Sequence, residues 1–175
     1  MVLLNVGNII DMQWVMRYNP GAVAYIWQGG QEGCRGVLDV LNGTVNPCGK
    51  LPDTIACTPA DYPAADHYGA DDRNIYAEDI YVGYRYFETF APEKVLYPFG
   101  FGLSYTKFEV RLLSADETAD GITAFAAVQN TGSCPGKEVV QLYCTAPQGR
   151  LGETVQSAVR LLQKPERWPM GRARP

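Results

Sequence analysis

Two short apolar segments, each followed by a turn and a helix-like segment, constrain the fold of this chain most strongly. Residues 2–6 (VLLNV) and 22–27 (AVAYIW) are largely apolar runs, as expected for strands buried in a parallel sheet. Residues 11–18 and 32–41 carry apolar side chains at helical spacing and end at Asn-Pro-Gly and Asn-Gly turns. This alternation of strand and helix predicts an α/β unit with a parallel sheet, which we assign to residues 1–55.

Each predicted helix presents one apolar face, which we expect to be buried. Asp11 stands where it can cap the first helix. The expected buried residues are Met12, Val15 and Met16 in the first helix and Cys34, Val37, Leu38 and Leu41 in the second.

The middle of the chain, residues 56–105, is interpreted as an irregular aromatic linker. Residues 53–79 are rich in Asp, Ala, Pro and Tyr and have no steady period. A loop of that length tends to be functional or to cover another domain. Residues 80–87 (IYVGYRYF) are rich in aromatic residues and predict a strand. In residues 97–105 (YPFGFGLSY) glycine and proline alternate with the aromatic residues.

From residue 108 the pattern is that of an all-β region. Residues 108–113, 122–128 and 138–144 alternate, and Asp-Gly and Asn-Thr-Gly sequences supply turns between them. Three strands begin an antiparallel sandwich without closing it, so residues 106–150 are expected to form a partial domain with open strand edges. We therefore expect poor solubility or self-association.

Charge is distributed unevenly along the chain. Residues 1–150 hold 10 Lys and Arg against 17 Asp and Glu, whereas residues 151–175 hold 5 against 2. The last 25 residues are thus basic although the whole chain has a net charge of −4, and we interpret residues 151–175 as an aberrant tail.

Composition excludes several classes of protein. The net charge of −4 argues against nucleic acid or an anionic membrane as the main partner. The chain has no apolar run of about 18 residues, so no spanning helix is expected. The first residues, MVLLNVGNIID, lack the basic region and cleavage site of a signal peptide. The cellular compartment is left open, with the cytoplasm slightly favoured.

Cysteine and histidine residues give no metal-site pattern. The chain has 5 Cys and 1 His, with no Cys-x-x-Cys spacing, so neither a zinc site nor another cofactor is expected. We expect the cysteines to be reduced and mostly buried. A disulfide between Cys134 and Cys144 is the alternative, against which the missing secretion signal argues.

Three further patterns contain residues that can carry chemistry. Gly29–Gly33 lies between strand and helix, where phosphate loops occur, but it matches no phosphate motif, and Glu32 opposes an anion. We interpret it as a tight turn and helix start; a place beside a bound sugar is the lesser alternative. His67 and Ser104 lack a nucleophile elbow, so no triad is predicted. Glu78 and Asp79 are adjacent carboxylates that would point to opposite faces of a strand, which makes them a poor catalytic pair.

A cluster of aromatic residues surrounds these carboxylates. Such residues can stack on sugar rings, but more often they form an interdomain core. The cluster comprises Tyr76, Tyr81, Tyr84, Tyr86, Phe87, Tyr97, Phe99, Phe101 and Tyr105.

Several motifs occur in a specific order. They are GQEG (30–33), NPCGKLP (46–52), IYVGYRY (80–86) and YPFGFGLSYTKF (97–108), followed by NTGSCPGKEVVQLY (130–143). In this order they resemble the C-terminal portion of glycoside hydrolase family 3, the β-glucosidase and β-xylosidase family. The resemblance covers about residues 1–150.

The resemblance implies that residues 1–55 are the end of the family's α/β sandwich domain. Residues 56–105 would lead out of it, and residues 106–150 would begin a fibronectin type III-like domain. The family's intact enzymes are retaining hydrolases. Their nucleophile is an aspartate on an N-terminal barrel, and their acid/base is a glutamate in a loop upstream of the strand that resembles residues 2–6. Both are expected to be missing here, so no residue of this chain is assigned as catalytic, and its binding residues are left unassigned.

The resemblance also implies what the chain does. We expect the C-terminal part of a retaining β-glycosidase that acts on β-glucosides or related sugars, inactive by itself, whose partners in the intact enzyme are a carbohydrate and the barrel. The alternatives are a non-catalytic carbohydrate-binding or interaction module and a fragment that docks with a separately encoded barrel. From about residue 154 the chain departs from the family pattern. Back-translating this segment with suitable codons and shifting the reading frame permits the family pattern, so we expect one or two frameshifts there.

Overall fold

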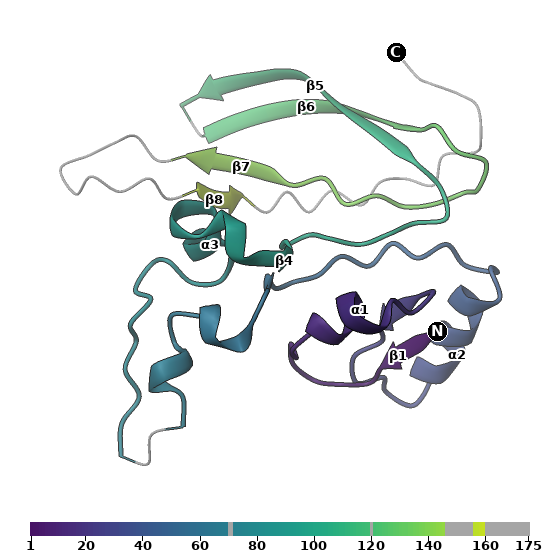
Figure 1. Ribbon diagram of the computed structural model, residues 1–175. Coiled ribbons are helices and arrows are strands. Elements are labelled where there is room, and N and C mark those ends of the chain that lie inside the picture. The colour runs from purple at the N-terminus through teal and green to yellow at the C-terminus, as the bar shows by residue number, and fades with distance from the viewer. Residues whose placement is uncertain (70–71, 120, 146–155, 160–175) are drawn as a thin grey trace.

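The first strand, β1 (Val2–Leu4), pairs in parallel with β2 (Val23–Tyr25) in the computed structural model (Figure 1). The structure describes residues 1–69, 72–119, 121–145 and 156–159. The predicted parallel pairing is therefore confirmed. The predicted burial is incomplete because this sheet has two strands in the described part of the chain, and the side chain of Leu3 is 41% exposed.

The two helices of this unit form where they were predicted, as α1 (Gln13–Tyr18) and α2 (Gly33–Leu41). The predicted cap is wrong, since Met12 and not Asp11 is the N-cap residue of α1; Asp11 lies one residue earlier and accepts from the N–H of Gln13 at 2.8 Å. The predicted faces are only partly correct. Met12 is buried, but Met16 is 74% exposed, Leu38 is 61% exposed and Cys34 is also exposed, whereas Val37 and Leu41 are half-buried.

Residues 53–79 are mostly irregular, as predicted, with one short strand, β3 (Ile55–Ala56), and two single-turn 3₁₀ helices, Pro59–Asp61 and Ala65–His67. The predicted strand over residues 80–87 is wrong. That segment runs into a helix, α3 (Tyr84–Phe90), which starts after Gly83 in a left-handed conformation, φ 61°. A third 3₁₀ helix (Pro92–Lys94) leads to β4 (Val95–Tyr97), which pairs antiparallel with β3.

The small core of the molecule lies between α3 and the β3–β4 pair. Phe87 and Ile55 are 1% exposed, and Ala56 and Ala91 are also buried. Helical spacing brings Phe87 and Ala91 to the same side of α3, against Ala56. Burial at this helical interval, rather than the strand preference of aromatic residues, decides the conformation of this segment.

The predicted strands at 108–113 and 122–128 are confirmed and are longer than expected. They form an antiparallel hairpin of β5 (Phe108–Thr118) and β6 (Gly121–Asn130), with an irregularity in register between Leu112 and Ser114. Val110 pairs with Val128, so these side chains share one face of the hairpin, and both are more than two-fifths exposed. An apolar face of the hairpin is thus open to solvent.

The third predicted strand, residues 138–144, begins later than expected. Only β7 (Leu142–Thr145) is extended, and it pairs antiparallel with β8 (Gln156–Val159). Residue Glu138 instead forms an ion pair with Lys50 outside the sheet. β8 lies within the stretch that was interpreted as an aberrant tail.

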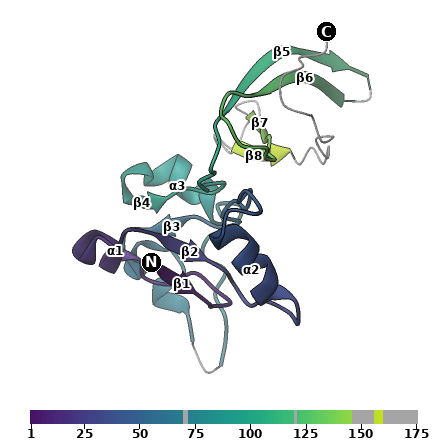
Figure 2. The same ribbon diagram turned by 90° about the vertical axis from the view of Figure 1, so that its right-hand side faces the viewer.

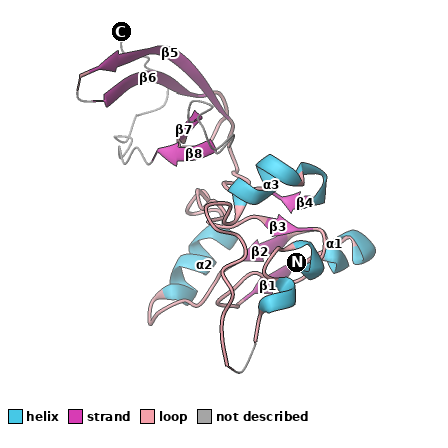
Figure 3. Cartoon of the chain, turned by 90° about the vertical axis from the view of Figure 1, so that its left-hand side faces the viewer, coloured by secondary structure: helices cyan, strands magenta, loops and turns pink. Residues whose placement is uncertain are grey.

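The elements fall into two lobes. Figures 2 and 3 show α1, α2 and β1–β3 in one lobe and β5–β8 in the other, with α3 close to the connection between them. None of the helices in the described part of the chain has the length and apolar character needed to cross a bilayer.

Candidate functional site

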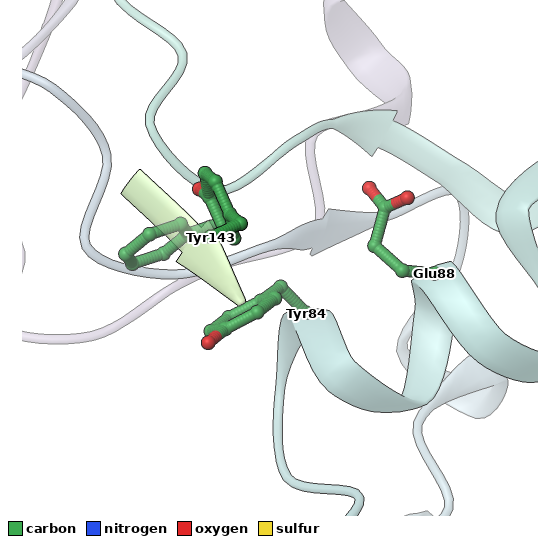
Figure 4. A pocket seen from close by; sticks show the side chains of 4 residues that line it. Tyr84, Glu88 and Tyr143 are labelled. Carbon is green, nitrogen blue, oxygen red and sulfur yellow. The ribbon is translucent and has the colours of Figure 1, made fainter. Parts of the chain in front are cut away.

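A pocket of about 240 Å³ opens where α3 meets the second lobe. It is lined by Tyr84 and Glu88 of α3, by Phe99 from the loop after β4, and by Tyr143 of β7. Figure 4 shows that Tyr84 and Glu88 project from the same helix while Tyr143 comes from the opposite side. The pocket is therefore built by both lobes.

The aromatic rings around this pocket pack mainly against one another. Tyr84 stacks on Phe99 with ring centroids 4.8 Å apart and an interplanar angle of 27°. Tyr143 meets Tyr84 edge-on at 6.0 Å, and the guanidinium of Arg85 lies 5.9 Å from the same ring. Because the faces of these rings are largely used within the protein, the cluster resembles an interlobe core more than a sugar platform.

Burial raises the pKa of Tyr143, and electrostatic repulsion from Tyr84 and Glu88 raises it further. The Tyr143 hydroxyl donates to Gln141 Oε1 at 2.7 Å. With one exposed carboxylate, Glu88, the pocket lacks the pair of carboxyl groups that glycoside cleavage needs.

The aromatic residues singled out in the sequence are divided among several places. Phe87 belongs to the core and Tyr86 packs against it, whereas Tyr76 is 89% exposed. The hydroxyl of Tyr105 donates to the carbonyl of Val40 at 2.9 Å. Sequence reasoning missed Tyr143 as a pocket residue, although its place in an alternating stretch could have suggested that it faces another element.

Gly29–Gly33 forms a tight turn and the start of a helix. The N–H of Gly33 donates to the carbonyl of Gly30 at 3.0 Å, and α2 begins at Gly33. Glu32 lies 3.8 Å from Arg35 in a surface ion pair, with both side chains more than three-quarters exposed. The turn interpretation is therefore confirmed.

The other candidate residues are not assembled into a catalytic arrangement. His67 is half-buried, at the end of its 3₁₀ helix. Ser104 Oγ donates to Asn46 Oδ1 at 3.0 Å, so its hydroxyl has a structural partner. Glu78 and Asp79 lie in a turn, where Asp79 has a φ of 52°, rather than beside a strand.

The cysteines differ from the prediction in their burial. Cys34, Cys48, Cys57 and Cys134 are free thiols, but Cys34 is exposed and the others are half-buried. The side chain of Cys144, the suggested partner of Cys134, lies outside the described residues. Across the residues that the structure describes, no group of three or more His, Cys, Asp or Glu could hold a metal ion.

Comparison with known proteins gives consistent matches. Residues 1–105 match the model of the glycosyl hydrolase family 3 C-terminal domain. A β-glucosidase of Ruminococcus albus is 54% identical over 155 residues, which are 89% of this chain and 16% of that protein. Beta-glucosidase A of Butyrivibrio fibrisolvens is 46% identical in an alignment of 189 positions, gaps included, which covers 94% of this chain and 23% of that protein.

Solved structures agree with these sequence matches. A β-glucosidase from Paenibacillus barengoltzii superimposes with a TM-score of 0.82 at 47% identity, covering 93% of this chain and 19% of that one. β-Glucosidase 3B from Thermotoga neapolitana, in complex with glucose, gives a TM-score of 0.77 at 37% identity, covering 94% and 24%. The chain thus spans between about a sixth and a quarter of the length of these relatives.

Proposed function

The chain belongs to glycosyl hydrolase family 3, and from this membership we propose that it is the C-terminal part of a retaining β-glycosidase acting on β-glucosides or related sugars. The observation that carries the proposal is the 54% identity to a β-glucosidase across 89% of the chain. Identity at this level over 89% of the chain supports the same fold in both lobes.

We propose that this chain does not hydrolyse glycosides by itself. Double displacement requires an acid/base and a nucleophile whose carboxyl groups lie about 5–5.5 Å apart across the bond. The described pocket has one carboxylate, Glu88, and the adjacent pair Glu78 and Asp79 lies in an irregular turn. The family's catalytic pair would be supplied by a barrel domain and by the loop upstream of β1.

The proposal extends to the domain boundaries. Residues 1–55 would end the α/β sandwich domain, residues 56–105 would lead out of it, and residues 106–150 would begin a fibronectin type III-like sandwich. The family model's match stops at residue 105, and the β5–β6 hairpin starts at Phe108, which supports a boundary there.

Residues from about 154 onward are proposed to be out of frame with the family. The reversal of charge in residues 151–175 supports this proposal. β8 is compatible with it because strand pairing uses main-chain groups that every sequence has. Sequencing the encoding DNA tests it: other frames that do not continue the family pattern would disprove it.

A chromogenic β-glucoside assay tests the proposed function. The chain alone should give no turnover above a buffer blank, whereas a chimera in which residues 1–150 replace the matching segment of the R. albus β-glucosidase should hydrolyse the substrate. Turnover by the chain alone would overturn the proposed division of labour. A chimera that folds but stays inactive would contradict the proposal that this chain is part of an active β-glycosidase.

A further inference from the structure

A small set of contacts joins the two lobes. The contacting residues belong to two of the family motifs, NPCGKLP (46–52) and NTGSCPGKEVVQLY (130–143). On one side are Asn46 and Lys50, in the segment between α2 and β3. On the other are Pro135, Gly136 and Glu138, in the segment between β6 and β7. We call these five residues the latch.

Asn46 uses both ends of its side-chain amide. Its Nδ2 donates to the carbonyl of Pro135 at 3.2 Å, across the two lobes. Its Oδ1 accepts from Ser104 Oγ at 3.0 Å and from the N–H of Tyr105 at 2.8 Å. One side chain thus organises the connecting segment and reaches the second lobe, which a carboxylate could not do because it only accepts hydrogen bonds.

Lys50 supplies a second link between the lobes. Its Nζ lies 3.0 Å from Glu138 Oε1 and donates to the carbonyl of Gly102 at 3.0 Å. The side chains of Lys50 and Glu138 are only 18% and 15% exposed. Water and salt therefore screen this pair less than an ion pair on the surface.

Two positions around the latch require glycine: Gly136, where the lobes approach each other, and Gly102, where the connecting segment packs on Gly49 and Lys50. A Cβ at Gly136 would run into Asn46 Nδ2 and would lie 3.0 Å from Cζ of Phe108. A Cβ at Gly102 would run into the carbonyl oxygen of Gly49 and would lie 3.0 Å from Cδ of Lys50. Packing at and beside the latch thus accounts for the glycines at positions 102 and 136.

We propose that the latch is the interaction surface by which the first lobe holds the second, so that the β5–β6 hairpin keeps its order through Asn46 and Lys50. The hairpin has one apolar face open and lacks a large core of its own in the described residues. Its protection from solvent should then depend on attachment more than on internal packing. This inference concerns architecture and does not rest on the proposed glycosidase function.

Amide hydrogen exchange on the full chain tests the proposal. Lys50→Met and Glu138→Gln should each speed exchange in β5, β6 and residues 131–143 at least tenfold, and leave β1, β2 and α2 unchanged. The double variant should accelerate exchange by less than the product of the two single effects, because both single variants lose the same ion pair. Asp61→Asn, which breaks an ion pair with Lys94 inside the first lobe, is the matched control and should leave the hairpin unchanged.

Two further variants separate the latch from general stability. Asn46→Asp keeps the acceptor for Ser104 and Tyr105 but loses the donor to Pro135, so it should speed exchange only in the second lobe. Gly136→Ala should act like Asn46→Asp, whereas Gly36→Ala, in open space on α2, should not. If Lys50→Met fails to fold, Lys50→Arg, which keeps a cation for Glu138 and a donor for the Gly102 carbonyl, should keep the protection of the hairpin. Unchanged exchange in the hairpin, or equal acceleration in both lobes, would overturn the proposal.

Discussion

Tyr62 meets Phe87 edge-on, with ring centroids 5.5 Å apart and ring planes at 90°. This contact joins the irregular segment after β3 to helix α3, which are separated by more than 20 residues of chain. Phe87 also meets Tyr86 at 5.3 Å, so it lies at the centre of the aromatic packing. The stability of the first lobe should therefore depend strongly on this one side chain.

Phe87→Ala should reduce the free energy of unfolding by about 3–5 kcal/mol, because it leaves a cavity at a site that is 1% exposed. Urea denaturation followed by tryptophan fluorescence measures the change. Phe125→Ala, at a site 57% exposed, serves as the control and should cost much less. Equal losses in the two variants would contradict the assignment of Phe87 to the core.

Tyr62→Phe should destabilise the chain by about 1–3 kcal/mol, since it leaves a buried donor without its partner. The hydroxyl of Tyr62 donates to the carbonyl of Thr54 at 2.8 Å and accepts from the N–H of Ala56 at 2.9 Å. The same denaturation curves report the loss. An unchanged midpoint would mean that the phenol adds nothing to the fold.

The same tyrosine predicts an effect of alkaline pH. Burial raises the pKa of Tyr62 above its ordinary value of 10.0. A raised pKa means that the folded state favours the neutral phenol, so the stabilisation is present below pH 10 and is lost as pH rises through the folded-state pKa. The alkaline limb of a stability profile should be shallower in Tyr62→Phe than in the parent chain, and identical slopes would refute this.

Asp61 predicts the opposite effect at acid pH. The hydrogen bond from Lys94 lowers its pKa below 3.8, with help from Thr58. The stabilisation is then present above pH 3.8 and is lost as pH falls through the folded-state pKa. Asp61→Asn should flatten the acid limb of the stability profile below pH 4, and NMR titration of the carboxyl gives an independent check.

The structure agrees best with the sequence-based predictions where the local pattern of apolar residues decides the secondary structure. The apolar runs around β1 and β2, and the helical period of α2, are such cases. Helix α3 was predicted as a strand because its aromatic residues favour strands, but the fold buries Phe87 and Ala91 at a helical interval. Burial of that kind depends on distant partners and is not visible in the segment itself.

The interlobe contacts could not be predicted for a related reason. Lys50 and Glu138 form an ion pair across 88 residues of sequence, and neither residue has an unusual local setting. The strand predicted from Glu138 begins only at Leu142, four residues after this ion pair. The pocket residues Tyr84 and Phe99 were singled out for sugar stacking, but their mutual packing became apparent only with the fold.

The open face of the β5–β6 hairpin predicts self-association. Leu112 and Ile122 are 59% and 54% exposed on this apolar face. Replacing both with Lys should shift the chain toward monomer in sedimentation velocity, because it removes apolar surface that can pair with a second copy. Thr123→Lys, on the opposite face, is the control, and a monomeric parent chain would contradict the prediction.

The hydrogen bond from Asn46 to the carbonyl of Pro135 spans 89 residues of chain. At a synthesis rate of about 5–20 residues per second, Asn46 leaves the ribosome on the order of ten seconds before its acceptor exists. During that interval Asn46 and Lys50 in the first lobe have no contact with the second lobe. The first lobe is therefore synthesised before the second, and this hydrogen bond between the lobes can form only after residue 135 has been made.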